Sequence, residues 1–62
     1  MNELLTRAEA ARKLKVSLPT FDRLLARAGF PSIRVGRTIR IHEEMLDRWV
    51  VENIGKEVQL HE

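Results

Sequence analysis

Arginines occupy every third position of one short stretch, "IRVGRTIRIH", residues 33–42. The three positions are Arg34, Arg37 and Arg40. They surround a single glycine, Gly36, and no acidic residue occurs between Asp22 and Glu43 to offset them. Guanidinium groups bind phosphates and base edges, and like charges placed side by side on neighbouring strands are unfavourable without a counter-ion. The stretch therefore predicts a surface for a polyanion; an ordinary hairpin whose arginines serve solubility is the alternative.

The histidine and acidic residues form no pattern typical of a catalytic or metal site. His42 precedes Glu43 and Glu44, and the simpler interpretation is the end of a strand and the start of a helix rather than an acid–base group or metal ligand. His61 has no partner in the sequence, and there is no cysteine for a disulfide or a thiolate metal site. No phosphate-binding glycine loop, nucleophile motif or metal spacing is present. We expect no enzyme activity and no cofactor.

The bulk composition fits one small folded domain. The chain has 62 residues, 44% of them hydrophobic and 32% charged, as in compact rather than disordered chains. No apolar run approaches the roughly 18 residues that span a membrane, and no signal peptide is seen, so we expect a cytoplasmic protein with no membrane partner. Residues 1–42 carry nine lysines and arginines against three acids, and residues 43–62 carry two against six. This split, +6 against −4, favours a basic face and an acidic end, with a generic solvated surface as the alternative.

Apolar residues alternate with polar ones on both sides of Gly36, which predicts two strands. The alternating positions are Ile33, Val35, Ile39 and Ile41. A two-residue turn at 36–37 would mix the two faces, whereas a three-residue loop, 36–38, keeps the apolar residues together. We predict the three-residue loop, with Arg34 and Arg40 side by side on the open face and Arg37 at the tip.

Two short helices precede the hairpin. "TRAE" from Thr6 to Glu9 has the form of a capping box and predicts a helix over 7–14. Ser17 is a good N-cap for a second helix over 18–28, with Pro19 in its first turn. Its apolar stripe consists of Phe21, Leu24, Leu25 and Ala28, and Gly29 is its expected C-cap.

A third helix is predicted over 43–53. Its expected buried stripe consists of Met45, Leu46, Trp49 and Val50. Gly55 ends it, and residues 56–62 are expected to form a flexible C-terminal tail after a single domain over 1–55.

Two short helices joined by a tight turn, the second polar on its outer face, indicate a helix-turn-helix. Such a unit places the N-terminal residues of its second helix in the DNA major groove. The candidate contacts are Ser17, Pro19, Thr20, Arg23 and Arg27. Arg23 suits a guanine or a phosphate, and the two hydroxyls suit the backbone; arginines that only solubilise the helix are the alternative.

The hairpin completes a mainly α fold with a small β-hairpin, a winged helix-turn-helix. Its candidate DNA contacts are Arg34, Gly36, Arg37, Thr38 and Arg40. Arg37 at the tip suits a narrow minor groove, which attracts arginine.

Three segments carry a family resemblance: "T-x-x-E-A-A-x-x-L-x-V-S" from Thr6, "RVGR-x-x-RI" from Arg34, and "L-D-R-W" from Leu46. Together they resemble the small excisionase-family DNA-binding domains, which are similar to the winged-helix domain of MerR-type regulators. Lys15 departs from the pattern, because glycine is common at that turn. A left-handed non-glycine residue there costs about 1–2 kcal/mol.

The resemblance implies a recognition helix in the major groove of double-stranded DNA and a wing on the adjacent groove. It also implies an accessory protein that bends DNA and directs a recombinase or integrase towards excision, without catalysis of its own. A small domain buries little DNA, so self-association on repeated sites is expected. The chain lacks a dimerising coiled coil, which argues against a small-molecule ligand. A transcriptional regulator or antitoxin of the same fold, and a protein-interaction module, remain alternatives.

Overall fold

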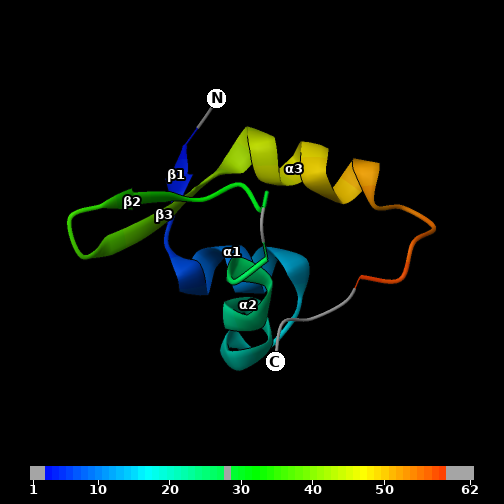
Figure 1. Ribbon diagram of the computed structural model, residues 1–62, viewed down its shortest axis with the longest axis horizontal. Helices are drawn as coiled ribbons and strands as arrows, with labels where there is room; N and C mark the ends of the chain where they lie inside the picture. The colour runs from blue at the N-terminus through cyan, green and yellow to red at the C-terminus, as the bar shows by residue number, and fades with distance from the viewer. Residues whose placement is uncertain (1–2, 28, 59–62) are drawn as a thin grey trace.

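A computed structural model describes residues 3–27 and 29–58 of the chain. The elements in order are β1 (Leu4–Leu5), α1 (Arg7–Leu14), α2 (Leu18–Leu25), β2 (Ile33–Val35), β3 (Thr38–His42) and α3 (Glu43–Glu52). The β2–β3 hairpin projects away from the three helices, and α3 crosses the molecule on the side opposite α2 (Figure 1). This is the predicted winged helix-turn-helix architecture, mainly helical with a small antiparallel sheet.

The α1–turn–α2 unit forms as local sequence predicts. The Glu9 amide donates to Thr6 Oγ1 at 3.1 Å, and the Thr6 amide donates to Glu9 Oε1 at 2.8 Å, which completes the capping box. Lys15 ends α1 in the left-handed region at φ 60° and ψ 42°. The Val16 amide donates to the Ala11 carbonyl at 3.0 Å, the Schellman pattern with a lysine where glycine is usual. The condition for backbone strain at this turn, a non-glycine residue in the left-handed region, is therefore met.

Helix α2 is shorter than predicted, ending at Leu25 rather than continuing through 28. Ala26 caps it in a right-handed conformation, and Gly29, the expected cap, adopts φ 85° in the loop that follows. The reason is tertiary. Phe30 is buried, and the Arg27 amide donates to the Leu24 carbonyl at 3.0 Å, a tight turn that directs the chain back into the core. Ala28, predicted on the apolar stripe, lies outside the described residues.

The core is small and centres on aromatic contacts. Phe30 packs edge-to-face on Phe21, with ring centroids 5.6 Å apart, and on Trp49 at 5.0 Å. The buried side chains are Ala10, Ala11, Phe21, Leu24, Phe30, Ile41 and Leu46. The two alanines let α1 approach its neighbours closely, as small side chains do.

The predicted stripe of α3 is only partly correct. Leu46 is fully buried and Trp49 half-buried, but Met45 and Val50 are 41% and 37% exposed. Leu46 is thus the buried residue of α3, and half-buried Trp49 reaches the core through its contact with Phe30.

The sheet has the order β1–β3–β2, with both pairs antiparallel. The short strand β1 was not predicted from the sequence. It pairs Leu4 with His42 and Leu5 with Ile41, so the chain leading into α1 is fixed to the base of the hairpin.

The predicted hairpin register is wrong. The structure pairs Val35 with Thr38, Arg34 with Ile39 and Ile33 with Arg40, which leaves a two-residue turn at 36–37. Gly36 adopts φ 63°, as the first central residue of a type II′ turn requires, and such turns match the twist of the strands.

This register changes what each face of the hairpin presents. Opposed residues share a face, so Arg34 and Arg40 lie on opposite faces instead of side by side. The apolar alternation is also broken, because Ile33 and Val35 are 49% and 56% exposed. Separating the two arginines removes the like-charge contact that the three-residue loop would have imposed.

The C-terminal segment begins close to its predicted position. Helix α3 ends at Glu52 with Asn53 as its cap. Val58 is half-buried and packs on the core, so the predicted tail over 56–62 starts as a packed segment; 59–62 lie outside the described residues. Within the described part of the chain, no helix has the length and apolar character needed to cross a bilayer.

Candidate nucleic-acid interface

The first turn of α2 is fixed by its own hydroxyls. Ser17 Oγ accepts from the Thr20 amide at 3.3 Å and donates to Thr20 Oγ1 at 3.0 Å. Ser17 therefore caps the helix as predicted, and Pro19 lies exposed beside it in the first turn. Thr20 is half-buried and borders an apolar groove, while its hydroxyl accepts from Ser17.

Two arginines predicted on the recognition helix have different surroundings. Arg23 is exposed in the last turn of α2. Arg27 lies beyond the end of that helix and is half-buried, and its Nη1 atom is buried without a hydrogen-bond partner among the described residues. Arg23 is thus the arginine that α2 itself presents to a ligand.

A cleft between α2 and the hairpin brings three arginines together. We call it the α2 cleft; it has a volume of about 450 Å³ and is lined by Arg7, Asp22, Leu25, Ala26, Arg34, Arg37 and Ile39. Arg34 faces it because its cross-strand partner, Ile39, lies on the face that packs towards the core. Two of the predicted hairpin arginines therefore face the recognition helix.

A second cleft lies between the start of α1 and the hairpin. We call it the α1 cleft; it measures about 380 Å³ and is lined by Thr6, Arg7, Ala8, Leu18, Arg37, Thr38, Ile39 and Arg40. Arg40 is half-buried here, and its Nη1 donates to the Ile39 carbonyl at 2.9 Å. Arg37, at the turn beside Gly36, borders both clefts. Four of the five predicted wing positions, Arg34, Arg37, Thr38 and Arg40, thus line two adjoining basic clefts rather than one open face, and Gly36 lines neither cleft.

Arg7 is the site residue that sequence reasoning missed. It is the first residue of α1, it borders both clefts, and its Nη1 lies 2.6 Å from Asp22 Oδ1 on α2. A partner fifteen positions away along the chain leaves no periodic signal. The available hint was the capping box, which places residue 7 at the start of a helix beside the hairpin.

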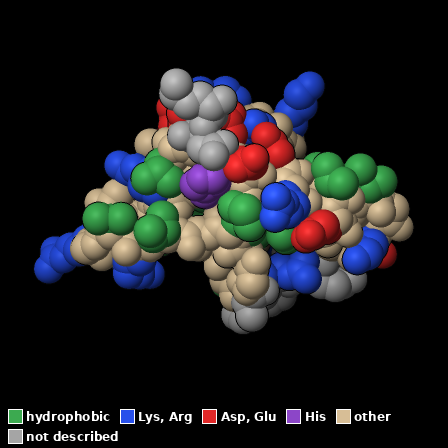
Figure 2. Space-filling model, turned by 90° about the horizontal axis from the view of Figure 1, so that it is seen from above, with side chains coloured by type: hydrophobic (Ala, Val, Ile, Leu, Met, Phe, Trp, Pro, Cys, Tyr) green, Lys and Arg blue, Asp and Glu red, His purple; other side chains and the backbone are tan. Residues whose placement is uncertain are grey.

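The acidic side chains lie away from the projecting hairpin. Lys and Arg side chains lie over the hairpin with exposed apolar side chains among them, whereas over the middle and helical part acidic and basic side chains are mixed (Figure 2). Lys13 on α1 pairs with Glu43 at 2.8 Å and with Asp47 at 3.0 Å, which ties α1 to α3. The hydrogen bonds that Lys13 donates to Glu43 and then to Asp47 raise the pKa of Lys13 above its ordinary value. The Lys13 ammonium is therefore already paired with two carboxylates of α3.

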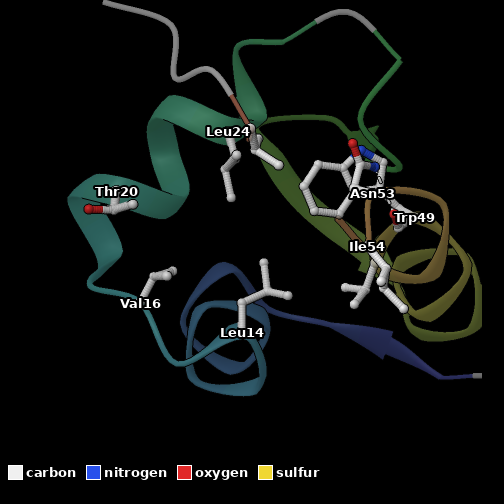
Figure 3. A pocket seen from close by; sticks show the side chains of 9 residues that line it. Leu14, Val16, Thr20, Leu24, Trp49, Asn53 and Ile54 are labelled. Atoms are coloured by element: carbon white, nitrogen blue, oxygen red, sulfur yellow. Dashed lines mark hydrogen bonds between the residues drawn. The ribbon is translucent and has the colours of Figure 1, made fainter. Parts of the chain in front are cut away.

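An apolar groove lies away from the basic clefts (Figure 3). Side chains from α1, the following turn, α2, α3 and the segment after α3 converge on it, including Leu14, Val16, Leu24, Trp49 and Ile54. The Asn53 side-chain amide donates to the Trp49 carbonyl at 2.8 Å at its edge. The described residues that line the groove include no acidic, basic, histidine or cysteine side chain.

His42 occupies the junction between β3 and α3, as predicted. Its Nδ1 accepts from the Met45 amide at 3.3 Å, so the imidazole caps α3. Across residues 3–27 and 29–58, no group of three or more His, Cys, Asp or Glu side chains is arranged to hold a metal ion. His61 lies outside the described residues.

Comparison with known proteins gives one family match. A family model described as a helix-turn-helix domain matches residues 4–53, a span that runs from β1 through the cap of α3 and contains both clefts. No curated protein and no solved structure matches the chain.

Proposed function

The chain belongs to the helix-turn-helix domain family of DNA-binding proteins, and we propose that it binds duplex DNA with α2 in the major groove and the β2–β3 hairpin on the adjacent groove. The observation that carries this proposal is the arrangement of basic side chains around α2. Arg23 lies exposed on the helix, and Arg34 and Arg37 border the cleft beside it. A phosphate backbone next to a helix in the major groove meets such a cleft.

The arginines divide into two roles. Arg23 is the candidate for a base edge, since a guanidinium binds guanine O6 and N7 with two hydrogen bonds. Arg34 and Arg40, on opposite faces of the hairpin, contact phosphates on either side of it. Arg37 at the turn enters the minor groove. With about five phosphates neutralised, the logarithm of the affinity falls with the logarithm of salt concentration at a slope of about −4 to −5.

Within this activity, we propose that the protein is an excisionase that bends DNA at the ends of a mobile element and directs an integrase towards excision. The resemblance in the helix-turn-helix, arginine hairpin and "L-D-R-W" segments supports this role. The protein contributes no catalysis; the integrase cuts and rejoins the strands. A domain this small buries little DNA surface, so several copies bind side by side, and the acidic residues of α3 are candidates for contacting a neighbouring copy or the integrase.

The test is to incubate the purified protein with sheared genomic DNA of its host and to sequence the recovered fragments. Clustered short repeats at the ends of an integrated element support the excisionase proposal, whereas sites upstream of unrelated genes identify a transcriptional regulator. Absence of any enrichment, with a flat salt dependence, refutes DNA recognition through the hairpin. An Arg48→Ala variant is the matched control for variants of the cleft arginines, because Arg48 is exposed on α3 and borders neither basic cleft.

A further inference from the structure

We propose that Arg7 binds a DNA phosphate and that Asp22 is the counter-ion it exchanges for that phosphate, so that the first turn of α1 is a third part of the interface. The inference rests on the proposed DNA binding and extends it to a residue outside the α2 and hairpin contacts.

The position of Arg7 is the first reason. It forms a wall common to the α2 cleft and the α1 cleft, together with Arg37 and Ile39. Arg34 also lines the α2 cleft, and Arg40 also lines the α1 cleft. A phosphate that enters either cleft therefore meets Arg7 as well as a hairpin arginine.

The ion pair between Arg7 and Asp22 is the second reason. Its Nη1 donates to Asp22 Oδ1 at 2.6 Å, and the side chains of both residues are 43% exposed. This contact engages one of the guanidinium's nitrogens, and the group has five N–H donors in a planar fork. An exposed ion pair contributes little net stability, whereas the fork binds a phosphate through two parallel hydrogen bonds. The carboxylate is thus an exchangeable partner.

The charge of the α2 cleft is the third reason. Arg7, Arg34 and Arg37 face one carboxylate, that of Asp22. In the free protein this carboxylate reduces the repulsion among the arginines. When DNA is bound, the Asp22 carboxylate repels the DNA phosphates. A phosphate and Asp22 therefore compete for the guanidinium of Arg7.

Two substitutions separate this role from a simple tether between α1 and α2. Arg7→Ala and Asp22→Asn both break the same ion pair, so a purely structural role changes DNA affinity in the same direction for both. Exchange with phosphate gives opposite signs. Arg7→Ala lowers affinity and reduces the salt slope by about 1. Asp22→Asn raises affinity for any duplex about threefold, as expected when one like-charge repulsion is removed at a few ångströms through water.

The experiment measures fluorescence anisotropy of a labelled duplex between 50 and 200 mM salt, with melting temperatures recorded for each variant. Arg7→Lys keeps the charge and is expected to retain most of the slope. Arg12→Ala, an exposed position on α1 that borders neither cleft, leaves the slope unchanged. If Arg7→Ala keeps the wild-type slope, or if Asp22→Asn binds more weakly than the folded wild type, the exchange is refuted. Failure of the wild-type protein to bind any duplex refutes the proposed function instead.

Discussion

Replacing Lys15 with glycine is expected to stabilise the protein. Lys15 holds φ 60° and ψ 42° at the turn between α1 and α2, where the Cβ of an L-residue crowds the following carbonyl. Relief of this strain is worth about 1–2 kcal/mol. Glycine costs about 0.4–1 kcal/mol through the greater freedom of the unfolded chain. The difference lies between about 0 and 1.6 kcal/mol, with a central value of about 0.8 kcal/mol in favour of glycine. The exposed lysine makes no side-chain ion pair within the described residues that would offset the gain.

The assay is reversible thermal unfolding followed by circular dichroism. For a domain of this size, 1 kcal/mol shifts the melting temperature by about 4–8 °C, so Lys15→Gly is expected to melt about 2–8 °C higher. Lys15→Ala is the control, because it removes the charge but keeps the Cβ, and it should leave the melting temperature close to that of the wild type. If Lys15→Gly melts at or below the wild-type temperature, the turn is not strained and the reasoning from its dihedral angles is wrong.

Substitutions in the core, in the cap of α1 and at the hairpin turn test three further predictions. Phe30→Ala removes the ring between Phe21 and Trp49 and is expected to cost about 3–5 kcal/mol, enough for chemical denaturation to show a largely unfolded population. Hydrogen bonds from the Thr6 backbone and side chain lower the pKa of Glu9, so its contribution to stability is present above about pH 4.5 and is lost as the pH falls through the lowered value; Glu9→Gln should flatten the acid limb of the melting-temperature profile. Arg37→Ala is expected to weaken DNA binding mildly, to reduce the salt slope by about 1 and to reduce bending in a gel-phasing assay, and an unchanged bend angle would contradict the role of the turn.

The parts of the fold that depend on local chemistry were predictable from the sequence. The capping box at Thr6 and the Ser17 cap each involve residues within a few positions of one another, and each has the predicted geometry. Helix α1 accordingly has the predicted bounds. Local hydrogen bonds are specified by neighbouring side chains, so no knowledge of the tertiary fold was needed.

The errors arise where distant segments decide the outcome. The two-residue turn at Gly36 was rejected because it mixes apolar and polar residues on each face. That argument assumes a fully covered face. In the structure the hairpin projects beyond the helices (Figure 1), so Ile33 and Val35 lie exposed and the turn geometry, rather than burial, determines the register. The early end of α2 has a similar origin, because burial of Phe30 outweighs the helical periodicity of residues 26–28.

The hairpin register also changes the physical argument for DNA binding. From the sequence, the case rested on Arg34 and Arg40 repelling each other across the strands until an anion neutralised them. The structure places them on opposite faces, so that repulsion is largely absent and a counter-ion is not required to hold the hairpin together. The basic charge instead lines two clefts beside α1 and α2, and Asp22 already neutralises part of it. A hairpin whose arginines already line clefts loses less conformational entropy on binding than a hairpin that forms only on DNA. Affinity therefore depends on how many cleft arginines meet phosphate at once, and the salt slopes of single-arginine variants measure that number directly.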